Sequence, residues 1–315
     1  MISLRQHAIS IAAIFLALAI GIVLGSQTLA SGVLSGLRDD KGDLQKQVDD
    51  LQDTNNQLEA QVGSADSFDA TTAGRVVAGV LDQRTVLIFT APDADPGDVE
   101  GITRMIEASG GSVTGKVSLT DAFIDAANGD RLRTALTNVI PAGVQLRTGA
   151  VDQGSLAGDL LGSVLQLNPQ SAQPQSTPQE MGLALDTLRS GGFIGYDNDA
   201  VRPAQLAVVV AGDGKGSDVG NRGAVVARFA GAIDARGAGA VLAGRPGSAS
   251  GNGAIAVTRS DSGLSAATST VDDIDRQMGR ITVPLALQEQ LNGASGRYGT
   301  GPKATAVTVG SKPSE

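Results

Sequence analysis

The residues that could do chemistry in this chain are few, and they form no catalytic set. The 315 residues include no cysteine and a single histidine, His7, beside the N-terminus. These counts exclude disulfides, thiolate catalysis, a Cys-based metal site, a cluster of His ligands and a Ser-His-Asp triad in the body of the chain. We therefore expect a protein that is not an enzyme and that holds no cofactor.

Two glycine-rich segments contain the residue types of a phosphate-binding loop. Residues 110–116 (GGSVTGK) match a P-loop as far as the lysine, but Val117 stands where Ser or Thr should bind magnesium, and the segment follows a helix pattern. Residues 212–216 (GDGKG) lie between a strand pattern and a helix pattern, which is the right context for a phosphate. Their glycine spacing departs from the dinucleotide fingerprint, and Asp213 would repel a phosphate. A plain connecting loop is therefore the favoured interpretation.

Two acidic clusters have the side chains of a cation site or an acid–base pair. The carboxylates between residues 93 and 100 fail the ligand positions of a calcium loop, so helix capping and support of the helix dipole explain them better. Asp272, Asp273 and Asp275 form the densest cluster. A hard cation could bind there, but a solvated helix start is the favoured interpretation.

The elements that must position these residues begin with an apolar N-terminus. Residues 8–25 (AISIAAIFLALAIGIVLG) contain no charge, which meets the length expected of a transmembrane helix. A cleaved signal peptide is the alternative, although its apolar core is usually shorter. Arg5 precedes the run, so the positive-inside rule places the N-terminus in the cytoplasm and the body outside. Ala17, Gly21 and Gly25 recur every four residues, a spacing that lets membrane helices pack closely.

A short coiled coil is predicted over residues 31–63. Leucines recur every seven residues at heptad position d, with valine and asparagine among the residues at position a. Leucine at d and a polar residue at a favour a parallel two-stranded coil, because a buried polar side chain fixes the register. One amphipathic helix packed on its own domain is the alternative, and residues 63–64 (GS) are expected to end the helix. The predicted interface residues are Leu37, Leu44, Val48, Leu51, Asn55 and Leu58.

The rest of the chain, from residue 64 onward, reads as an α/β domain. Residues 85–90 (TVLIFT) and 205–211 (QLAVVVA) are continuous apolar runs, typical of strands buried on both faces, and a helix pattern follows each of them. This alternation predicts a mainly parallel sheet with flanking helices. Further strands are expected at residues 112–119, 240–243, 254–258 and 305–309.

The domain is expected to divide at a segment rich in Pro and Gln, residues 168–179 (NPQSAQPQSTPQ), which reads as a linker or exposed loop. The predicted parts are a membrane anchor at 1–30, the coiled coil at 31–63, a first α/β unit at 64–167, the linker at 168–179, and a second α/β unit with a tail at 180–315. The net charge of −9 and the absence of a long basic run argue against a nucleic-acid partner.

Several segments resemble the MctB family of copper transport proteins from actinobacteria, in order along nearly the whole chain. They are residues 1–8 (MISLRQHA), 15–26 (FLALAIGIVLGS), 151–162 (VDQGSLAGDLLG), 227–230 (ARFA), 242–245 (LAGR), 269–275 (STVDDID), 279–283 (GRITV) and 298–301 (YGTG). The resemblance implies a pore-forming or channel-associated oligomer of the outer membrane that acts in copper efflux and copper homeostasis. Corynebacterial relatives imply an alternative, a non-enzymatic envelope scaffold that recruits a membrane-protein partner for cell-wall remodelling or cell separation.

The residues qualify what the resemblance implies. One apolar helix favours an inner-membrane anchor, and eight aromatic residues are too few for the girdles of a membrane barrel. Copper prefers thiolate, thioether or imidazole ligands, whereas this chain offers one histidine and four scattered methionines, Met1, Met105, Met181 and Met278. We therefore expect a homo-oligomer, a parallel dimer or higher, that transports copper without binding it tightly.

Overall fold

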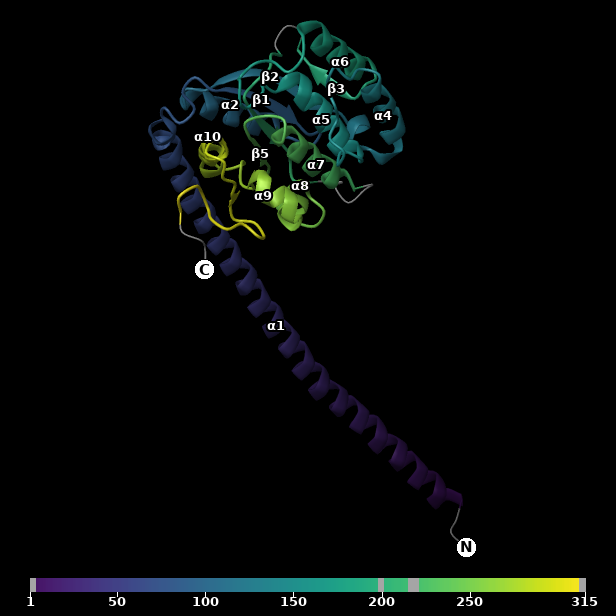
Figure 1. Ribbon diagram of the computed structural model, residues 1–315. Helices are drawn as coiled ribbons and strands as arrows, with labels where there is room; N and C mark the ends of the chain where they lie inside the picture. The colour runs from purple at the N-terminus through teal and green to yellow at the C-terminus, as the bar shows by residue number, and fades with distance from the viewer. Residues whose placement is uncertain (1–3, 198–200, 215–220, 312–315) are drawn as a thin grey trace. The chain divides into compact units, whose positions relative to one another are not determined.

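The computed structural model describes residues 4–197, 201–214 and 221–311, with side chains described from residue 6 to 25 and from residue 41 onward within those ranges (Figure 1). The chain forms two compact units. The first is Met1–Ala65 and the second is Asp66–Glu315.

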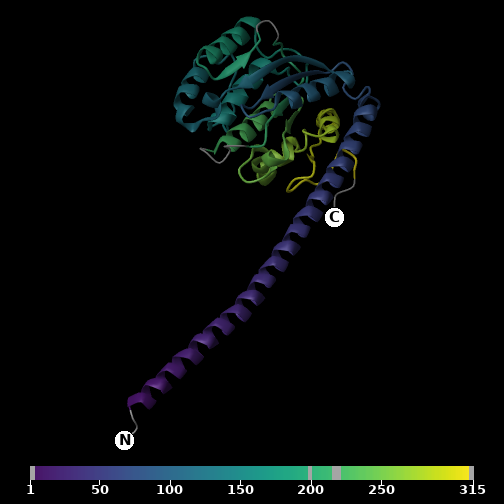
Figure 2. The same ribbon diagram turned by 180° about the vertical axis from the view of Figure 1, so that it is seen from behind.

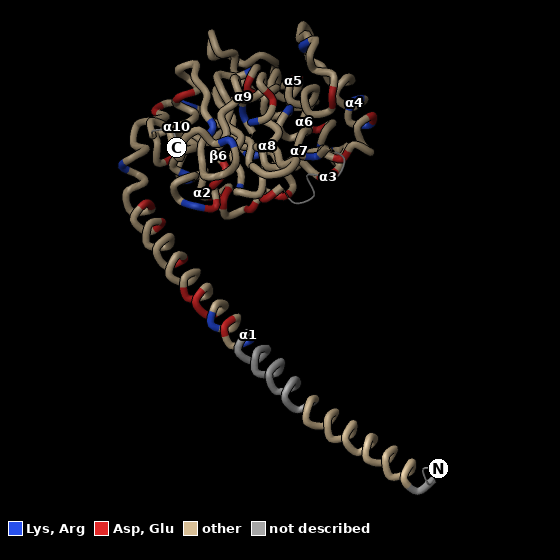
Figure 3. The backbone as a smooth tube through the Cα atoms, turned by 90° about the horizontal axis from the view of Figure 1, so that it is seen from below, with Lys and Arg blue, Asp and Glu red and all other residues tan. Residues whose placement is uncertain are grey.

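One long helix, α1 (Leu4–Val77), makes up the described part of the first unit and continues into the second. It confirms the predicted apolar N-terminal helix. Among the described residues, Gln6–Gly25 is the one helical stretch that could cross a membrane by length and composition, with a mean hydropathy of 2.7. Figure 3 shows no Lys, Arg, Asp or Glu within this stretch.

The prediction that α1 ends at residues 63–64 is wrong. The Ser64 hydroxyl donates to the carbonyl of Ala60 at 2.9 Å, a bond that lets serine sit inside a helix. Further along, Ala73 and Val77 are buried and pack with Ile281 in a small core of the second unit. That burial stabilises the last turns of α1. These turns lie beyond the end of the heptad repeat, so the repeat alone does not predict them.

The second unit is built on a seven-stranded sheet of order β3-β2-β1-β4-β5-β6-β7. All pairs are parallel except β2–β3, which is antiparallel, so the predicted mainly parallel sheet is confirmed. Strands from both predicted α/β units enter this one sheet, because β4 pairs with β1 and β3 pairs with β2. The strands are β1 (Thr85–Thr90), β2 (Ser112–Leu119), β3 (Ile194–Tyr196), β4 (Leu206–Val210), β5 (Ala240–Ala243), β6 (Ser269–Val271) and β7 (Arg297–Tyr298).

Helices cover both faces of the sheet (Figures 1 and 2). Alternate residues of each central strand point to opposite faces, so Val86 and Ile88 of β1 join one core and Leu87 and Phe89 the other. The first core is closed by α2 and α10, and the second by α4, α5, α6 and α7. In the second core the ring of Phe229 packs edge-on against that of Phe89, with 5.1 Å between the ring centroids. The helices of this unit are α2 (Pro96–Ala108), α3 (Asp121–Ile124), α4 (Gly129–Thr137), α5 (Gln153–Leu165), α6 (Pro178–Ser190), α7 (Arg222–Asp234), α8 (Ala254–Ser260), α9 (Ser262–Ala267) and α10 (Gln277–Leu291), with 3-10 turns η1 (Ala126–Asn128) and η3 (Pro246–Ala249).

Two predicted strands are wrong. Residues 254–258 form the first turns of α8, where the Thr258 hydroxyl donates to the carbonyl of Ala254 at 2.9 Å. Residues 305–309 make a single bridge, between Ala306 and Tyr298. Both segments are short apolar runs, and periodicity cannot assign such runs to helix or strand.

A stripe of glycines lets α5 approach α7 closely. Gly154, Gly158 and Gly162 recur every four residues along one face of α5. A Cβ at Gly158 would lie 2.5 Å from the carbonyl oxygen of Phe229 and 2.7 Å from the Cβ of Ala232, both on α7. The backbones of the two helices are therefore in contact at Gly154 and Gly158, and a side chain at either position would push the helices apart.

We expect Gly158→Ala to destabilise the domain by ~1–3 kcal/mol, because overpacking a tight core displaces its neighbours. Gly182→Ala on α6 is the matched control, since nothing lies within 4 Å of the added methyl group. That control should be neutral or gain up to ~1 kcal/mol from helix propensity. Thermal unfolding of both variants in non-ionic micelles checks the prediction, and equal stability would contradict the close packing.

Candidate functional site

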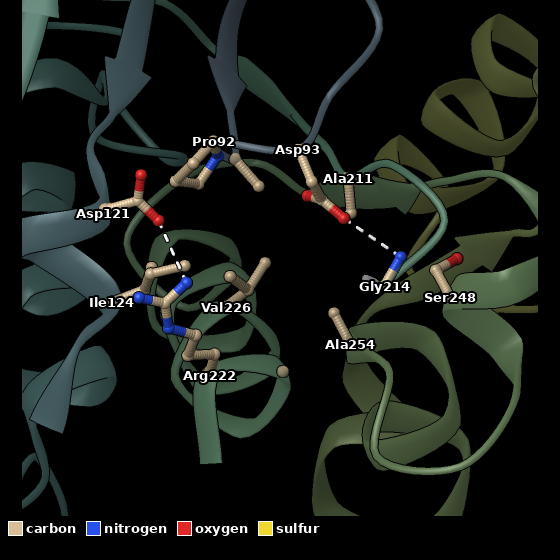
Figure 4. Close-up of a pocket in the computed structure, with 12 residues that line it drawn as sticks. Pro92, Asp93, Asp121, Ile124, Ala211, Gly214, Arg222, Val226, Ser248 and Ala254 are labelled. Carbon is tan, nitrogen blue, oxygen red and sulfur yellow. Dashed lines mark hydrogen bonds and ion pairs between the residues drawn. The ribbon is translucent and has the colours of Figure 1, made fainter. Parts of the chain in front are cut away.

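A crevice opens where the strand order reverses. The chain passes from β1 outward to β2 and β3, then returns to the other side of β1 to form β4. The loops after β1 and β4 diverge, and in open α/β sheets this is the usual place for a ligand. Here the crevice encloses a cavity of ≈ 140 Å³ (Figure 4). Its apolar lining is Ala91, Pro92, Ile124, Ala211, Val226 and Ala254.

Asp93 closes one side of the crevice. Its carboxylate accepts the backbone N–H groups of Gly212 at 3.2 Å and Gly214 at 3.0 Å. The fit is tight, because a Cβ on Gly212 would overlap the carbonyl oxygen of Asp93, and Gly214 has a φ of +70°, which favours glycine. Amides that could cradle a bound anion are therefore already bonded to a side chain of the protein itself.

Arg222 closes the opposite side. It begins α7, and its guanidinium donates to Asp121 at 3.0 Å (Figure 4). The same guanidinium lies 3.8 Å from Asp125. These two ion pairs tie the start of α7 to α3 and η1. Ser248 completes the polar lining, and its hydroxyl donates to the carbonyl of Arg245 at 2.7 Å.

Charged side chains are buried at the same edge of the sheet, past β5 and β6. Asp98 is 1% exposed and accepts from Arg245 at 2.6 Å and from Arg280 at 2.9 Å. Arg259 and Asp272 form a fully buried pair at 2.5 Å. Because each of these charges has a partner, the arrangement avoids the large cost of an isolated buried ion.

Asp273 is the exception among the described residues. It is 2% exposed, and neither carboxylate oxygen has a hydrogen-bond partner. Burial, followed by the neighbouring charges of Asp272 and Asp275, raises the pKa of Asp273 to about 7. A buried unpartnered carboxyl group marks either a strained or a functional position.

The sequence predictions for these polar groups have mixed outcomes. Asp95 does cap α2, accepting from the backbone N–H of Gly97 at 2.8 Å. Residues 110–116 lie between α2 and β2 and partly within β2, as expected of a segment that is no P-loop. The solvated helix start predicted at Asp272 and Asp273 is wrong, because both are buried.

Sequence reasoning missed the arginines that hold this edge together. Arg245 and Arg280 lie 147 and 182 residues from their partner Asp98, so no local spacing reveals the pair. The available signal was that both arginines fall within segments that resemble the MctB family, residues 242–245 and 279–283.

The predicted coiled-coil residues lie on one stripe of α1. Leu44, Leu51 and Leu58 are 61%, 69% and 54% exposed, and Val48 and Asn55 are also exposed. The side chain of Leu37 lies outside the described residues. Partners for this stripe stay a prediction, as does the packing of the membrane helix through Ala17, Gly21 and Gly25.

No described arrangement offers copper its preferred ligands. Met105 Sδ accepts from the Gln277 amide at 3.3 Å, and Met181 packs against the domain core. Within the described ranges, no group of three or more His, Cys, Asp or Glu side chains could hold a metal ion.

The class of protein follows from these parts: an α/β domain whose first six strands follow the doubly wound order, joined to a helix of membrane-spanning length. The chain belongs to the MctB family, since residues 1–309 match the family described as "Copper transport outer membrane protein, MctB". It is 47% identical over 312 residues to the "Copper transporter MctB" of Mycobacterium tuberculosis (strain ATCC 25618 / H37Rv). The aligned region covers 98% of this chain and 99% of the relative. It is 46% identical over 315 residues to the protein of the same name from Mycobacterium leprae (strain TN), with the same coverage.

Proposed function

We propose that this protein acts in copper transport at the cell envelope, as a membrane-anchored and self-associating component that passes copper without chelating it. The observation that carries the proposal is the family match along residues 1–309, together with relatives of nearly equal length that are named copper transporters. The structure supports it through three features: a membrane-length helix, an exposed heptad stripe and the shortage of soft ligands.

The N-terminal helix supports a membrane anchor with the α/β domain outside the cytoplasm. Gln6–Gly25 carries no formally charged residue and has the length to span a bilayer. Arg5 on its N-terminal side favours a cytoplasmic N-terminus. An added Cβ at Gly21 or Gly25 would meet nothing within 4 Å, so the small-residue face is open to a second helix.

The heptad stripe supports a parallel homo-oligomer. Leu44, Leu51 and Leu58 supply position d and Val48 and Asn55 supply position a. In a parallel pair, positions g and e of the two helices place Gln47 beside Gln52, Thr54 beside Glu59 and Asp40 beside Gln45. None of these pairs brings like charges together, so nothing at the flanks opposes self-association.

The side chains available as copper ligands support transport of copper rather than tight binding. A single apolar helix encloses no pore, so a copper path requires several copies or a channel-forming partner. Copper(I) binds tightly to thiolates and thioethers, but the described methionines Met105, Met181 and Met278 lie apart in sequence on three helices, α2, α6 and α10. The described part of the chain therefore offers copper no cluster of soft ligands, which favours release over tight binding.

A two-part experiment tests the proposal. Cells lacking the gene should accumulate copper, and the unmodified chain should restore the normal content, measured by mass spectrometry of washed cells. In parallel, the purified full chain in micelles should lose a competition for Cu(I) against a nanomolar chelator. Unchanged copper content with failed cell separation would establish the scaffold alternative instead. A sub-nanomolar affinity for Cu(I) would contradict transport without tight binding and would indicate that the protein chelates copper.

A further inference from the structure

We propose that the crevice at the carboxyl ends of β1 and β4 binds a small organic cation, with its ammonium group on Asp93 and its hydrocarbon part on the apolar wall. This site is separate from copper passage and does not depend on the proposed function. Three observations support the site: the side chain bonded to the glycine-loop amides, the balance of charge, and the shape of the lining.

Asp93 excludes the ligand that this fold position most often takes. Doubly wound sheets bind phosphate through glycine-loop amides at this point. Here the amides of Gly212 and Gly214 already donate to the two oxygens of Asp93. A phosphate would have to displace a carboxylate that two backbone amides hold, against the repulsion between two anions.

The charge of the lining favours a cation. Arg222 is matched by Asp121 and lies near Asp125, so its positive charge is already countered. Asp93 has hydrogen bonds from two neutral amides and no ion pair among the described residues. Each carboxylate oxygen keeps a lone pair after accepting one N–H, so Asp93 can accept further from an ammonium donor.

The lining also selects an organic cation over a metal ion. The described residues hold no cluster of acidic or imidazole side chains fit for a metal. The remaining wall is aliphatic, formed by Ala91, Pro92, Val226 and Ala254, which suits a short hydrocarbon chain. Asp93 and Ala254 both line the cavity, so a ligand held by Asp93 lies in the same space as this aliphatic wall.

The probe is n-butylammonium, titrated calorimetrically into the full chain in non-ionic micelles, with n-butanol and ADP as comparison ligands. We expect one butylammonium per chain and no binding of ADP. Butanol should bind at least tenfold more weakly, because it lacks the charge. Equal binding of butanol, or binding of ADP to the unmodified chain, would overturn the assignment.

Two variants locate the site. Asp93→Asn removes the charge and should weaken butylammonium binding at least tenfold. Ala254→Leu fills the cavity while leaving Asp93 in place, so it tests the site even if the first variant fails to fold. Asp186→Asn is the matched control, since Asp186 is an exposed carboxylate on α6 that pairs with Arg189 at 3.0 Å. Butylammonium affinity that survives both crevice variants, or that falls with Asp186→Asn, would refute the proposal.

Discussion

Asp273→Asn is expected to raise the free energy of unfolding at pH 8 by up to ~4 kcal/mol and to leave it nearly unchanged at pH 4. The shift of the Asp273 pKa from 3.8 to about 7 follows first from burial, and each pKa unit corresponds to about 1.4 kcal/mol. Asparagine has nearly the same shape and no charge. It therefore removes the cost of ionising a buried group that has no partner.

The sign of the pH dependence follows from where the proton binds. The folded state holds the Asp273 proton up to about pH 7, whereas the unfolded state releases it near pH 3.8. The stabilisation is therefore complete below pH 3.8, falls as the pH rises to about 7, and stays lost above that value. Asp234 has a pKa raised to about 7 as well, mainly by burial, and adds a second fall over the same range.

Urea unfolding of the wild type and Asp273→Asn between pH 5 and 8.5 measures this difference. The variant should show a shallower slope, to which Asp234 and Asp275 still contribute because burial raises the pKa of both. Adding Asp234→Asn to Asp273→Asn should make the slope shallower again. Asp186→Asn, at an exposed carboxylate, is the control and should follow the wild type. Parallel pH profiles of wild type and Asp273→Asn would show that Asp273 is not buried as described.

The sheet could be predicted because its central strands β1, β4 and β5 are continuous apolar runs. Residues 85–90 and 240–243 were placed correctly from sequence, because short continuous apolar runs are typical of strands buried on both faces. Residues 112–119 were also placed correctly, from their alternation of side chains, and β2 is only partly buried. The order of the strands could not be predicted, because pairing of β1 with β4 joins segments about 120 residues apart. The same limit hid the true length of α1, whose last turns are stabilised by α10.

Only part of the crevice could be predicted from the sequence. The glycines of residues 212–216 and the strand before them marked a loop of the right kind. Its occupant, Asp93, lies 119 residues from Gly212 and was assigned to helix capping with its acidic neighbours. A contact between backbone amides and a carboxylate so far apart in the sequence has no local spacing pattern. The residue types therefore predicted the glycine loop but not the side chain that binds it.

Replacing both Leu44 and Leu51 with Asp is expected to convert a dimer of residues 31–315 to a monomer. Burying one leucine contributes about 1.5–3 kcal/mol, and a dimer loses four of them. Such a loss corresponds to at least a thousandfold weaker association. The second unit should stay folded, because its two large cores contain no residue from 31–63.

Sedimentation equilibrium measures the change, and the heptad supplies its own control. Gln57→Asp with Ala60→Asp adds the same two charges at the outer positions c and f, both exposed, so this variant should stay dimeric. Asn55→Leu should associate more tightly and lose its preference for two strands, because the polar a residue sets strand number. If the unmodified fragment is already monomeric at tens of micromolar, the leucine stripe is not a self-association surface in the absence of the membrane helix. In that case the full chain in micelles decides whether residues such as Gly21 and Gly25 first bring two copies together.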